Sequence, residues 1–260
     1  MELLRTEKVS KNYGEKTVLR DISIHLEEGE MVSLLGLSGS GKTTLLNILS
    51  GLIAPDAGKV FLSGRDITGQ PGHISYMLQK DLMLEHKRVI DNVALPLLIR
   101  GMKKAEARAK AEPFFPVFDL EGTQMQYPSE LSGGMRQRAA LLRTYLGSQG
   151  TILLDEPFSA LDMITRAQLH DWYLKIMAEM GLSTVLITHD VDEAIQLSDR
   201  IYLLTGSPGE IHHEIRITVP RISGRILICS RSSRPTSGTS GISCWIPPGW
   251  AMRKRNCPER

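Results

Sequence analysis

A glycine-rich loop between an apolar segment and a run of helix-forming residues constrains the fold of this chain more than any other feature. The loop is Gly36-Leu37-Ser38-Gly39-Ser40-Gly41-Lys42-Thr43; a strand is predicted before it at Met31–Leu35 and a helix after it at Thr43–Gly51. Glycines let backbone N–H groups wrap phosphates, the lysine reaches the outer phosphates, and the threonine hydroxyl ligates Mg²⁺. The alternative is a plain glycine-rich turn before a helix, but the flanking strand and helix favour a phosphate site in an α/β fold.

A second segment, Leu131-Ser132-Gly133-Gly134-Met135-Arg136-Gln137-Arg138, has the pattern of another anion-binding helix start. Ser132 and two glycines precede a run of good helix formers that continues to Arg143. We expect a capped helix whose bare backbone N–H groups lie at the positive end of the helix dipole, which favours an anion. Since one nucleotide needs only one such cradle, two of them suggest a nucleotide that two subunits share.

The length and composition indicate a globular protein. The 260 residues suffice for one large or two small domains, and 42% of them are hydrophobic and 23% charged. The longest apolar runs, such as Met31–Leu35 and Ile152–Leu154, are far short of the roughly 20 residues that cross a bilayer. The first residues also lack the apolar core of a signal peptide. We therefore expect a cytosolic chain that reaches any membrane through a partner.

Periodicity along the first 220 residues predicts an α/β fold. Residues 4–28 alternate apolar and polar positions around Asn12-Tyr13-Gly14, as in an antiparallel hairpin. Residues 88–147 form a helical insertion, in which Pro113 is expected to end a charged helix at Lys103–Glu112. The other predicted elements are strands at Val60–Leu62, His73–Met77, Thr151–Leu154, Thr184–Thr188 and Ile201–Leu204 and a helix at Met163–Met180. Because that helix separates two strands, those strands should be parallel and joined by a crossover.

Two acidic residues that follow a buried strand are candidates for chemistry. Asp155 and Glu156 end the apolar run Thr151–Leu154. Asp155 is placed to hold Mg²⁺ through water, and Glu156 to polarise an attacking water as a general base. Alone, such a pair is more often a helix cap or a solvated turn. A phosphate loop in the same chain favours the catalytic interpretation.

Two further polar residues follow predicted strands. His189 comes directly after Thr184–Thr188, and the carboxyl ends of parallel strands are where α/β sheets bind ligands. We expect His189 to contact a γ-phosphate, although a lone histidine is normally structural or superficial. Gln79, after the strand Ile74–Leu78, would be an ordinary surface residue by itself. His212 and His213 have no ligand spacing and are interpreted as surface residues.

Residues 221–260 differ in charge and pattern from the rest of the chain. They hold seven Arg and one Lys against Glu259 alone, a net charge of +7 in a chain whose net charge is +2. They have little periodicity, so disorder is expected, and they contain all three cysteines at spacings that do not suggest zinc. The composition is that of an out-of-frame translation, and we hypothesise a frameshift near Arg221. A genuine basic tail that contacts lipid or nucleic acid is the rival interpretation.

The ordered set of motifs resembles the nucleotide-binding subunit of an ABC transporter. The set consists of Tyr13, GLSGSGKT from Gly36, Gln79, LSGGMRQR from Leu131, ILLDEP from Ile152, Ser159-Ala160-Leu161-Asp162 and His189, and it covers residues 2–220. The resemblance implies a P-loop NTPase ABC cassette over residues 1–220, with a mixed-sheet core, an antiparallel β subdomain and the helical insertion. It also implies a head-to-tail dimer of two copies. Each ATP then lies between the phosphate loop of one subunit and Ser132–Gly134 of the other.

The resemblance also assigns roles to individual residues. Tyr13 is expected to stack on adenine, Gln79 to sense Mg²⁺ and the attacking water, and Asp162 to communicate across the dimer. The implied ligands are ATP and Mg²⁺. The candidates are catalytic residues Lys42, Gln79, Glu156 and His189; nucleotide-binding residues Tyr13, Gly36, Ser38, Gly39, Ser40, Gly41, Lys42, Thr43, Thr44, Ser132, Gly133, Gly134 and Asp162; and metal ligands Thr43, Gln79 and Asp155.

Within this family, a single short cassette resembles the importer subunits. Residues 79–84 with Asp91-Asn92-Val93, and residues 206–211, are similar to the nitrate/sulfonate/taurine group, which includes some importers of the thiamine precursor hydroxymethylpyrimidine. This implies ATP hydrolysis that drives solute uptake at the cytoplasmic face of a bacterial membrane. The implied partners are permease subunits, which insert a short helix after Gln79, and indirectly a solute-binding protein; no nucleic acid is expected. The chain departs from the group at Glu85-His86, where members often have Pro-Trp, and after Pro220-Arg221, where they usually continue as an acidic helix.

Two other classes of ATPase share parts of this pattern. A DNA-repair or chromosome ATPase usually carries a long coiled coil or a zinc module between the positions of Lys42 and Ser132. The stretch between them here is too short for either and contains no cysteine. A non-hydrolysing regulatory cassette is the second alternative, and the intact set of Lys42, Glu156 and His189 argues against it.

Overall fold

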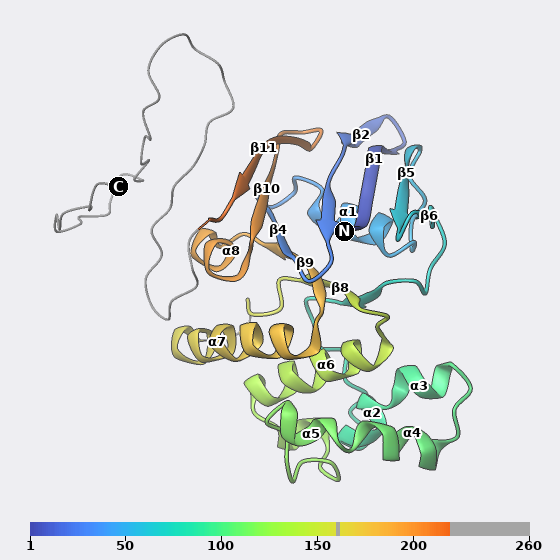
Figure 1. Ribbon diagram of the computed structural model, residues 1–260, viewed down its shortest axis with the longest axis vertical. Helices are drawn as coiled ribbons and strands as arrows, with labels where there is room; N and C mark the ends of the chain where they lie inside the picture. The colour runs from blue at the N-terminus through green and yellow to red at the C-terminus, as the bar shows by residue number, and fades with distance from the viewer. Residues whose placement is uncertain (160–161, 219–260) are drawn as a thin grey trace, which may run out of the picture.

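The centre of the fold is a mainly parallel sheet with its strands in the order β11-β10-β4-β9-β8-β7 (Figure 1). The structure, a computed structural model, describes residues 1–159 and 162–218, so the interpretation of residues 221–260 lies outside the described residues. The strands are β4 (Met31–Leu35), β7 (Ser75–Met77), β8 (Thr151–Asp155), β9 (Ser183–Thr188), β10 (Arg200–Thr205) and β11 (Glu210–Arg216). Strands β8 and β9 pair in parallel, as predicted for the strands that flank Met163–Met180.

Side chains on the two faces of this sheet enter two separate cores. One core contains helix α1 (Lys42–Leu49), and the other contains α6 (Gly133–Gly147) and α7 (Met163–Met180). The residues of β8 and β9 alternate between them: Leu153, Val185 and Ile187 enter the first core, and Ile152, Leu154 and Leu186 the second. This alternation follows from the period of two in a strand, and it explains why both strands are apolar along their length. Helices α1 and α6 therefore cover opposite faces of the sheet.

A second, antiparallel sheet is built mainly from the N-terminal part of the chain, with its strands in the order β2-β1-β5-β6 and β3 also paired with β1. The strands are β1 (Glu2–Tyr13), β2 (Lys16–Ile22), β3 (His25–Glu27), β5 (Ala57–Leu62) and β6 (Arg65–Asp66). The predicted hairpin is confirmed as the β1–β2 pair, but Asn12 and Tyr13 belong to β1 and pair with Thr17 and Lys16. The turn starts at Gly14 because its φ of 60° is a conformation that glycine adopts without strain.

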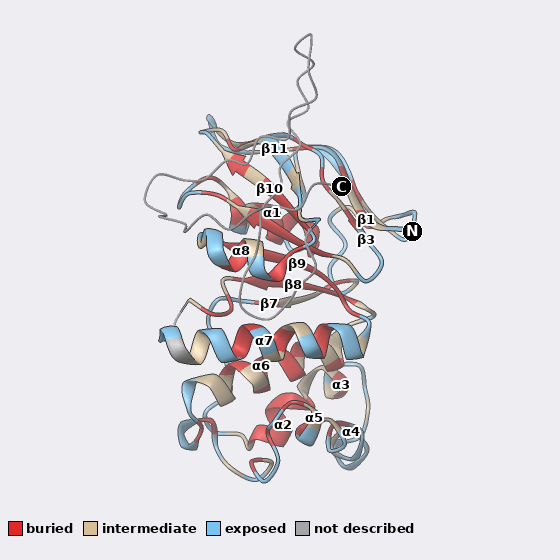
Figure 2. Cartoon of the chain, turned by 60° about the vertical axis from the view of Figure 1, so that its left-hand side comes forward, coloured by how far each residue is buried: buried red, intermediate tan, exposed pale blue. Residues whose placement is uncertain are grey.

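The helices between β7 and β8 lie on the far side of α6 from the sheet, in the lower part of Figure 1. They are α2 (Val89–Val93), α3 (Leu95–Ile99), α4 (Lys104–Ala111) and α5 (Phe114–Val117), which join α6 in the stretch predicted to be helical. Helix α4 ends just before Pro113, as predicted. Figure 2 shows buried residues on α2, on α6 and α7 above it, and on the sheet. Within the described residues, no helix is long and apolar enough to span a bilayer.

Strand β11 is an element that the sequence pattern failed to predict. It pairs antiparallel with β10, and the register shifts between Leu203 and Leu204, which pair with His213 and Ile211. His212 is therefore an extra residue in the ladder, and a bulge of this kind breaks the regular alternation of apolar and polar positions. His212 and His213 are both exposed, in agreement with their interpretation as surface residues.

Candidate functional site

The strand order places four predicted groups beside one another at the carboxyl edge of the central sheet. The phosphate loop follows β4, Glu156 follows β8, and His189 follows β9, while Gln79 lies just beyond β7. These strands are consecutive neighbours and run in parallel. The crevice outside the carboxyl ends of such strands is the usual ligand position in an α/β sheet. The topology therefore gathers residues from widely separated parts of the sequence into one site.

Two glycines of the phosphate loop leave no space for a side chain. A Cβ on Gly36 would lie 2.2 Å from the backbone oxygen of Leu204 in β10, and a Cβ on Gly41 would lie 2.6 Å from Leu19 Cδ2 in β2. Gly41 is also the N-cap residue of α1, with φ of 94° in the left-handed region. The loop is thus held in shape by strands on both sides. Its backbone N–H groups gain a fixed arrangement without any capping side chain.

Lys42 folds back over this loop. Its Nζ donates hydrogen bonds to the backbone oxygens of Gly36 at 2.8 Å and Leu37 at 2.9 Å. Burial lowers the pKa of the ammonium, while the charges of Glu156 and Asp155 act in the opposite direction. A partly desolvated cation beside two carboxylates and a ring of N–H groups is suited to bind the outer phosphates of a nucleotide.

Asp155 and Thr43 supply oxygen ligands of the kind that Mg²⁺ requires. Asp155 Oδ2 accepts hydrogen bonds from Thr43 Oγ1 at 3.3 Å and from the Tyr76 hydroxyl at 3.2 Å. Burial raises the pKa of Asp155, and the neighbouring charge of Glu156 adds to this effect. A nearby cation would relieve that cost. No cluster of three or more His, Cys, Asp or Glu side chains in the described part of the chain could hold a metal. A site with few protein ligands fits Mg²⁺, which keeps water and substrate phosphates as its other ligands.

Glu156 has an unusual backbone conformation that could not be predicted from the sequence. Its φ is 44°, in the left-handed region that non-glycine residues rarely adopt. The Glu156 N–H donates to Ile187 O at 3.0 Å, and the Ser159 hydroxyl donates to Glu156 O at 3.0 Å. These two bonds fix both sides of the strained residue. Strain of this kind is concentrated at functional sites, where it aims a side chain.

The carboxylate of Glu156 is the meeting point of the other two polar groups. Gln79 Nε2 donates to Glu156 Oε2 at 3.2 Å, and His189 Nδ1 lies 3.0 Å from Glu156 Oε1. An ionised carboxylate only accepts hydrogen bonds, so Nδ1–H is the donor. One carboxylate, one amide and one imidazole are therefore in direct contact at this edge of the sheet.

The second predicted helix start is a conventional cap. Ser132 is the N-cap residue of α6, and its Oγ accepts a hydrogen bond from the Met135 N–H at 3.3 Å. Ser132 and Gly133 are exposed. Because α6 covers the opposite face of the sheet from α1, the two helix starts lie in different layers of the fold.

The remaining candidate residues lie at exposed turns or in the loop itself. Tyr13 ends β1 with 49% of the residue exposed, and Lys11 Nζ lies 5.8 Å from its ring centroid. Asp162 Oδ1 accepts from the Thr165 N–H at 3.0 Å and so caps α7. In the loop, Ser38 and Gly39 are exposed, and Ser40 is buried with no hydrogen-bond partner for its Oγ among the described residues. Thr44 is half-buried in the first turn of α1.

Sequence patterns gave no role to two residues that contact the site or its surroundings. Tyr76 lies inside the predicted strand His73–Met77, and only its pairing with Leu153 of β8 brings it close to Asp155. Arg136 lies in the motif that begins α6, but its ion pairs with Asp81 and Glu85 join residues more than fifty positions apart. A strand register or a long-range pair of this kind cannot be read from local periodicity.

Comparison with known protein families and relatives agrees with this geometry. Residues 19–159, more than half of the chain, match the family described as ABC transporter. The chain is 40% identical over 249 residues to an uncharacterized ABC transporter ATP-binding protein, YtlC of Bacillus subtilis; the alignment covers 94% of this chain and 95% of YtlC. It is 41% identical over 220 residues to the formylaminopyrimidine import ATP-binding protein ThiZ of Halalkalibacterium halodurans, covering 84% of this chain and 85% of ThiZ.

Among solved structures, the chain is similar to the ATP-binding cassette MJ0796, described as a dimer in a post-hydrolysis state bound to ADP and Pi. The TM-score is 0.70 at 30% sequence identity, and the match covers 82% of this chain and 98% of MJ0796. The similarity thus extends over nearly the whole described part of the chain.

Proposed function

The chain belongs to the ABC transporter family, and on that premise we propose that it hydrolyses ATP in a head-to-tail dimer to power solute import through separate membrane subunits. ATP-binding proteins of this family are ATPases coupled to transport. The proposed cassette spans residues 1–220, with α2 to α6 as its helical subdomain. Relatives named as import ATP-binding proteins favour this over a DNA-repair or regulatory ATPase.

The observation that carries the proposal is the contact of Glu156 with both Gln79 and His189 beside the phosphate loop. Glu156 is the proposed general base: its carboxylate accepts a proton from the water that attacks the γ-phosphate. Gln79 orients that water from one side. His189 holds Glu156 through Nδ1, which leaves its other ring nitrogen to contact the γ-phosphate.

The other residues bind and orient the nucleotide. Lys42 and the N–H groups from Gly36 to Thr44 take the phosphates, and Tyr13 stacks on the adenine from its exposed position at the end of β1. Thr43, Asp155 and Gln79 would hold Mg²⁺, which when bound supplies positive charge against the phosphate oxygens. The chain's own contribution there is the pair of oxygen atoms 3.3 Å apart on Thr43 and Asp155.

The second nucleotide contact comes from a partner copy. The cassette MJ0796, which was solved as a dimer, supports a dimer for this chain. We propose that Ser132, Gly133 and Gly134 bind the phosphates of the partner's ATP, and that Asp162 lies at the dimer interface. The exposed cap of α6 supplies N–H groups and a helix dipole for an anion.

Partners and place in the cell follow from import. The proposed partners are permease subunits that dock near the segment after Gln79, and through them a solute-binding protein. The proposed location is the cytoplasmic face of a bacterial membrane. For the solute we propose a pyrimidine thiamine precursor or a nitrate, sulfonate or taurine-type anion; ThiZ, named for formylaminopyrimidine import, is the relative that favours the first.

The decisive test replaces Glu156 by Gln in the full-length chain. Loss of a general base lowers rate by roughly 10²–10⁴, so we expect phosphate release to fall by that factor while equilibrium binding of ATP is preserved. The matched control is Glu193→Gln, which changes a buried glutamate on α8 (Val191–Leu197) that contacts His170 instead of the site. Near-normal turnover in Glu156→Gln would refute the assignment of the base.

The solute is tested in a transporter assembled from this chain, the proposed permease subunits and their solute-binding protein. We expect the ATPase rate of that complex in vesicles to rise with a formylated aminopyrimidine. A rise with taurine or an alkanesulfonate alone would assign the second solute class instead.

A further inference from the structure

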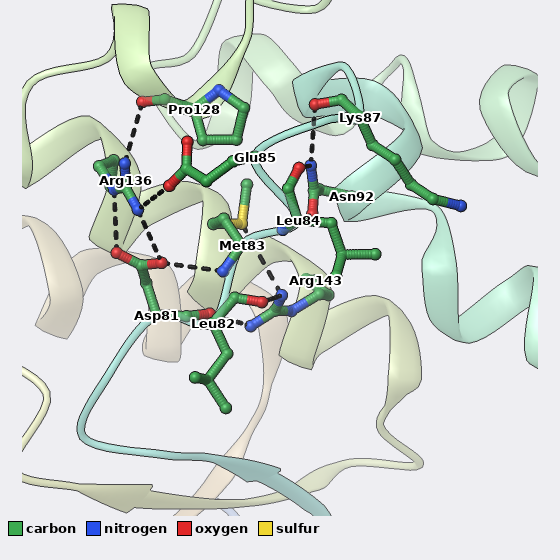
Figure 3. A network of polar contacts seen from close by, with 10 residues as sticks. All are labelled: Asp81, Leu82, Met83, Leu84, Glu85, Lys87, Asn92, Pro128, Arg136 and Arg143. Carbon is green, nitrogen blue, oxygen red and sulfur yellow. Dashed lines mark hydrogen bonds and ion pairs between the residues drawn. The ribbon is translucent and has the colours of Figure 1, made fainter.

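Two arginines of α6 hold the chain segment that follows Gln79 (Figure 3). The Arg136 guanidinium donates to Asp81 Oδ2 at 2.9 Å and to Asp81 Oδ1 at 3.2 Å, and it also reaches Glu85 Oε1 at 2.8 Å. Arg143 donates to the backbone oxygen of Leu82 at 2.9 Å and to that of Asp81. Residues 136 and 143 lie about two turns apart on the helix. Attachment at two separated points resists both sliding and rotation of the segment.

The segment is also fixed from within and from α2. Met83 N–H donates to Asp81 Oδ1 at 2.9 Å, and Leu84 N–H donates to Asn92 Oδ1 at 2.7 Å. Asn92 is fully buried, and its Nδ2 returns a hydrogen bond to Leu84 O at 3.1 Å. Residues 81–84 are thus held along their backbone as well as by one carboxylate.

The ion pair between Asp81 and Arg136, at the centre of this network, is less exposed than an ordinary surface ion pair. The side chains of Arg136 and Asp81 are 26% and 20% exposed, and the guanidinium takes both carboxylate oxygens. Burial raises the pKa of Asp81, but hydrogen bonds from Arg136 and the Met83 N–H outweigh it and hold this pKa below its ordinary value. Forked, partly buried pairs of this kind are stronger and more directional than exposed ones.

The two ends of the network lie at the two predicted nucleotide contacts. Gln79, two residues before Asp81, donates to Glu156 in the chain's own site. Arg136 lies in the first turn of α6, where its N–H donates to the Ser132 backbone oxygen at 2.9 Å. Glu156 is therefore connected to Ser132 by the hydrogen bond to Gln79, the short stretch of chain from Gln79 to Asp81, the ion pair of Asp81 with Arg136, and the first turn of α6.

We infer that the Asp81–Arg136 ion pair is a positioning link that makes Gln79 and Ser132 move as one unit. The inference rests on the proposed function, in which Gln79 serves the chain's own ATP and Ser132 the ATP of the partner. Binding at one nucleotide site then sets the position of the group offered to the other, and the coupling between the two sites passes through this pair. Asp81 and Arg136 touch neither nucleotide; they act through the residues they hold.

The test compares Asp81→Asn with Asp91→Asn in the full-length chain. Asp91 forms a two-point ion pair with Arg108, at 2.8 Å for both bonds, which joins α2 to α4 instead of α6 to the Gln79 segment. We expect Asp81→Asn to lower kcat about fivefold and to bring the Hill coefficient for ATP toward one, because contacting residues couple by amounts of this order. The intrinsic affinity of a single site for ATP should not change. Both variants lose a two-point ion pair, so both should lower the melting temperature by a similar amount. Asp91→Asn should nevertheless leave kcat and the Hill coefficient as in the wild type.

A second pair of measurements asks whether Asp81 acts through Gln79. In a Gln79→Ala background, Asp81→Asn should cause no further loss of kcat. Arg136→Lys, which keeps the charge but loses the fork, should fall between wild type and Asp81→Asn. Losses that simply multiply, or equal kinetics for the Asp81 and Asp91 variants, would overturn the link. A wild-type chain without ATP binding or hydrolysis would overturn the proposed function instead, so the two failures are distinct.

Discussion

The two helix starts of this chain reach similar chemistry by opposite means. At α1 no side chain caps the helix: Gly41 is in the left-handed region, and the loop is pressed between Leu204 and Leu19. At α6 a serine makes an ordinary side-chain cap, and the start is exposed. The first is shaped by the sheet and surrounded by carboxylates. The second is shaped by its own sequence and faces outward.

This difference teaches which start can work alone. Lys42, Asp155 and Glu156 are coupled by charge around the start of α1, so binding and proton transfer share one place. The start of α6 has N–H donors for an anion and is linked to Gln79 through Arg136. The proposed base, Glu156, does not lie at this start: it contacts Gln79 and His189 at the edge of the sheet. A bare anion-binding helix start contributes binding and electrostatic stabilisation only, and it needs a partner that brings the reacting groups.

The largest expected effect comes from blocking the exposed start with Ser132→Arg. A large cation at this position removes the cap and fills the space for the partner's phosphates. Loss of a comparable electrostatic group costs roughly 10²–10³ in kcat, so we expect hydrolysis to fall by at least a hundredfold while nucleotide binding at Lys42 persists. Phosphate release and equilibrium binding of a fluorescent ATP analogue measure the two effects.

Ser132→Thr is the matched control, since threonine also caps a helix. It should keep most of the hydrolysis. Full activity of Ser132→Arg would show that the α6 start takes no part in the reaction, and the contrast between the two starts would lose its functional meaning.

The second effect concerns stability and uses alanine at one glycine of each start. Gly36→Ala forces a Cβ to within 2.2 Å of a backbone oxygen, and Gly134→Ala brings one only to 3.4 Å from Thr165 Cγ2. Overpacking against a rigid strand costs about 1–3 kcal/mol, whereas alanine in a helix is favoured over glycine by up to about 1 kcal/mol. We expect the free energy of unfolding to fall in the first variant and to stay level or rise in the second. Urea unfolding followed by circular dichroism distinguishes them; equal losses would contradict the idea that only α1 is shaped by its surroundings.

Much of this fold could be predicted from local patterns, because apolar runs and punctuating glycines mark β4, β8 and β9 directly. The phosphate loop and the Ser132 cap were equally visible, since each is a short contiguous motif with its own physical reason. Strand β11 could not be predicted in this way, because the bulge at His212 shifts its alternation of apolar and polar residues. The β1–β2 turn was placed two residues too early, because only the structure shows that Tyr13 still pairs with Lys16.

The contacts within the site were less predictable than its members. Gln79, Glu156 and His189 were each predicted as candidates. Their meeting on one carboxylate depends on the order of β7, β8 and β9 in the sheet, which local patterns do not predict. The positive φ of Glu156 and the Tyr76 contact with Asp155 likewise follow from tertiary bonds. The Asp81–Arg136 pair joins residues 55 positions apart, beyond the reach of any periodic pattern.

The smallest expected effect tests whether the α1 start is destabilised for its chemistry, using Asp155→Asn. Burial raises the pKa of Asp155. A carboxyl with a raised pKa stabilises the fold below its unfolded pKa of about 3.9 and loses that contribution as pH rises through the folded pKa. Asparagine removes the buried charge, so at pH 7 the variant should unfold at a higher temperature than the wild type. The difference should shrink as the pH is lowered toward 4.

The control for that experiment is Asp91→Asn, for which the expected change in stability at pH 7 has the opposite sign. Hydrogen bonds from Arg108 lower the pKa of Asp91, so its contribution is present above the unfolded pKa and is lost as pH falls through the folded pKa. Asp91→Asn should therefore be less stable than wild type at pH 7, with a gap that closes on acidification. Thermal melts of both variants between pH 4 and 8 measure this, with Mg-ATP added in a second series that should stabilise the wild type more than Asp155→Asn. If Asp155→Asn instead loses stability at pH 7 without nucleotide, the α1 start carries no buried-charge penalty. The two helix starts would then differ in their backbone shape but not in the energetic cost of a buried charge beside them.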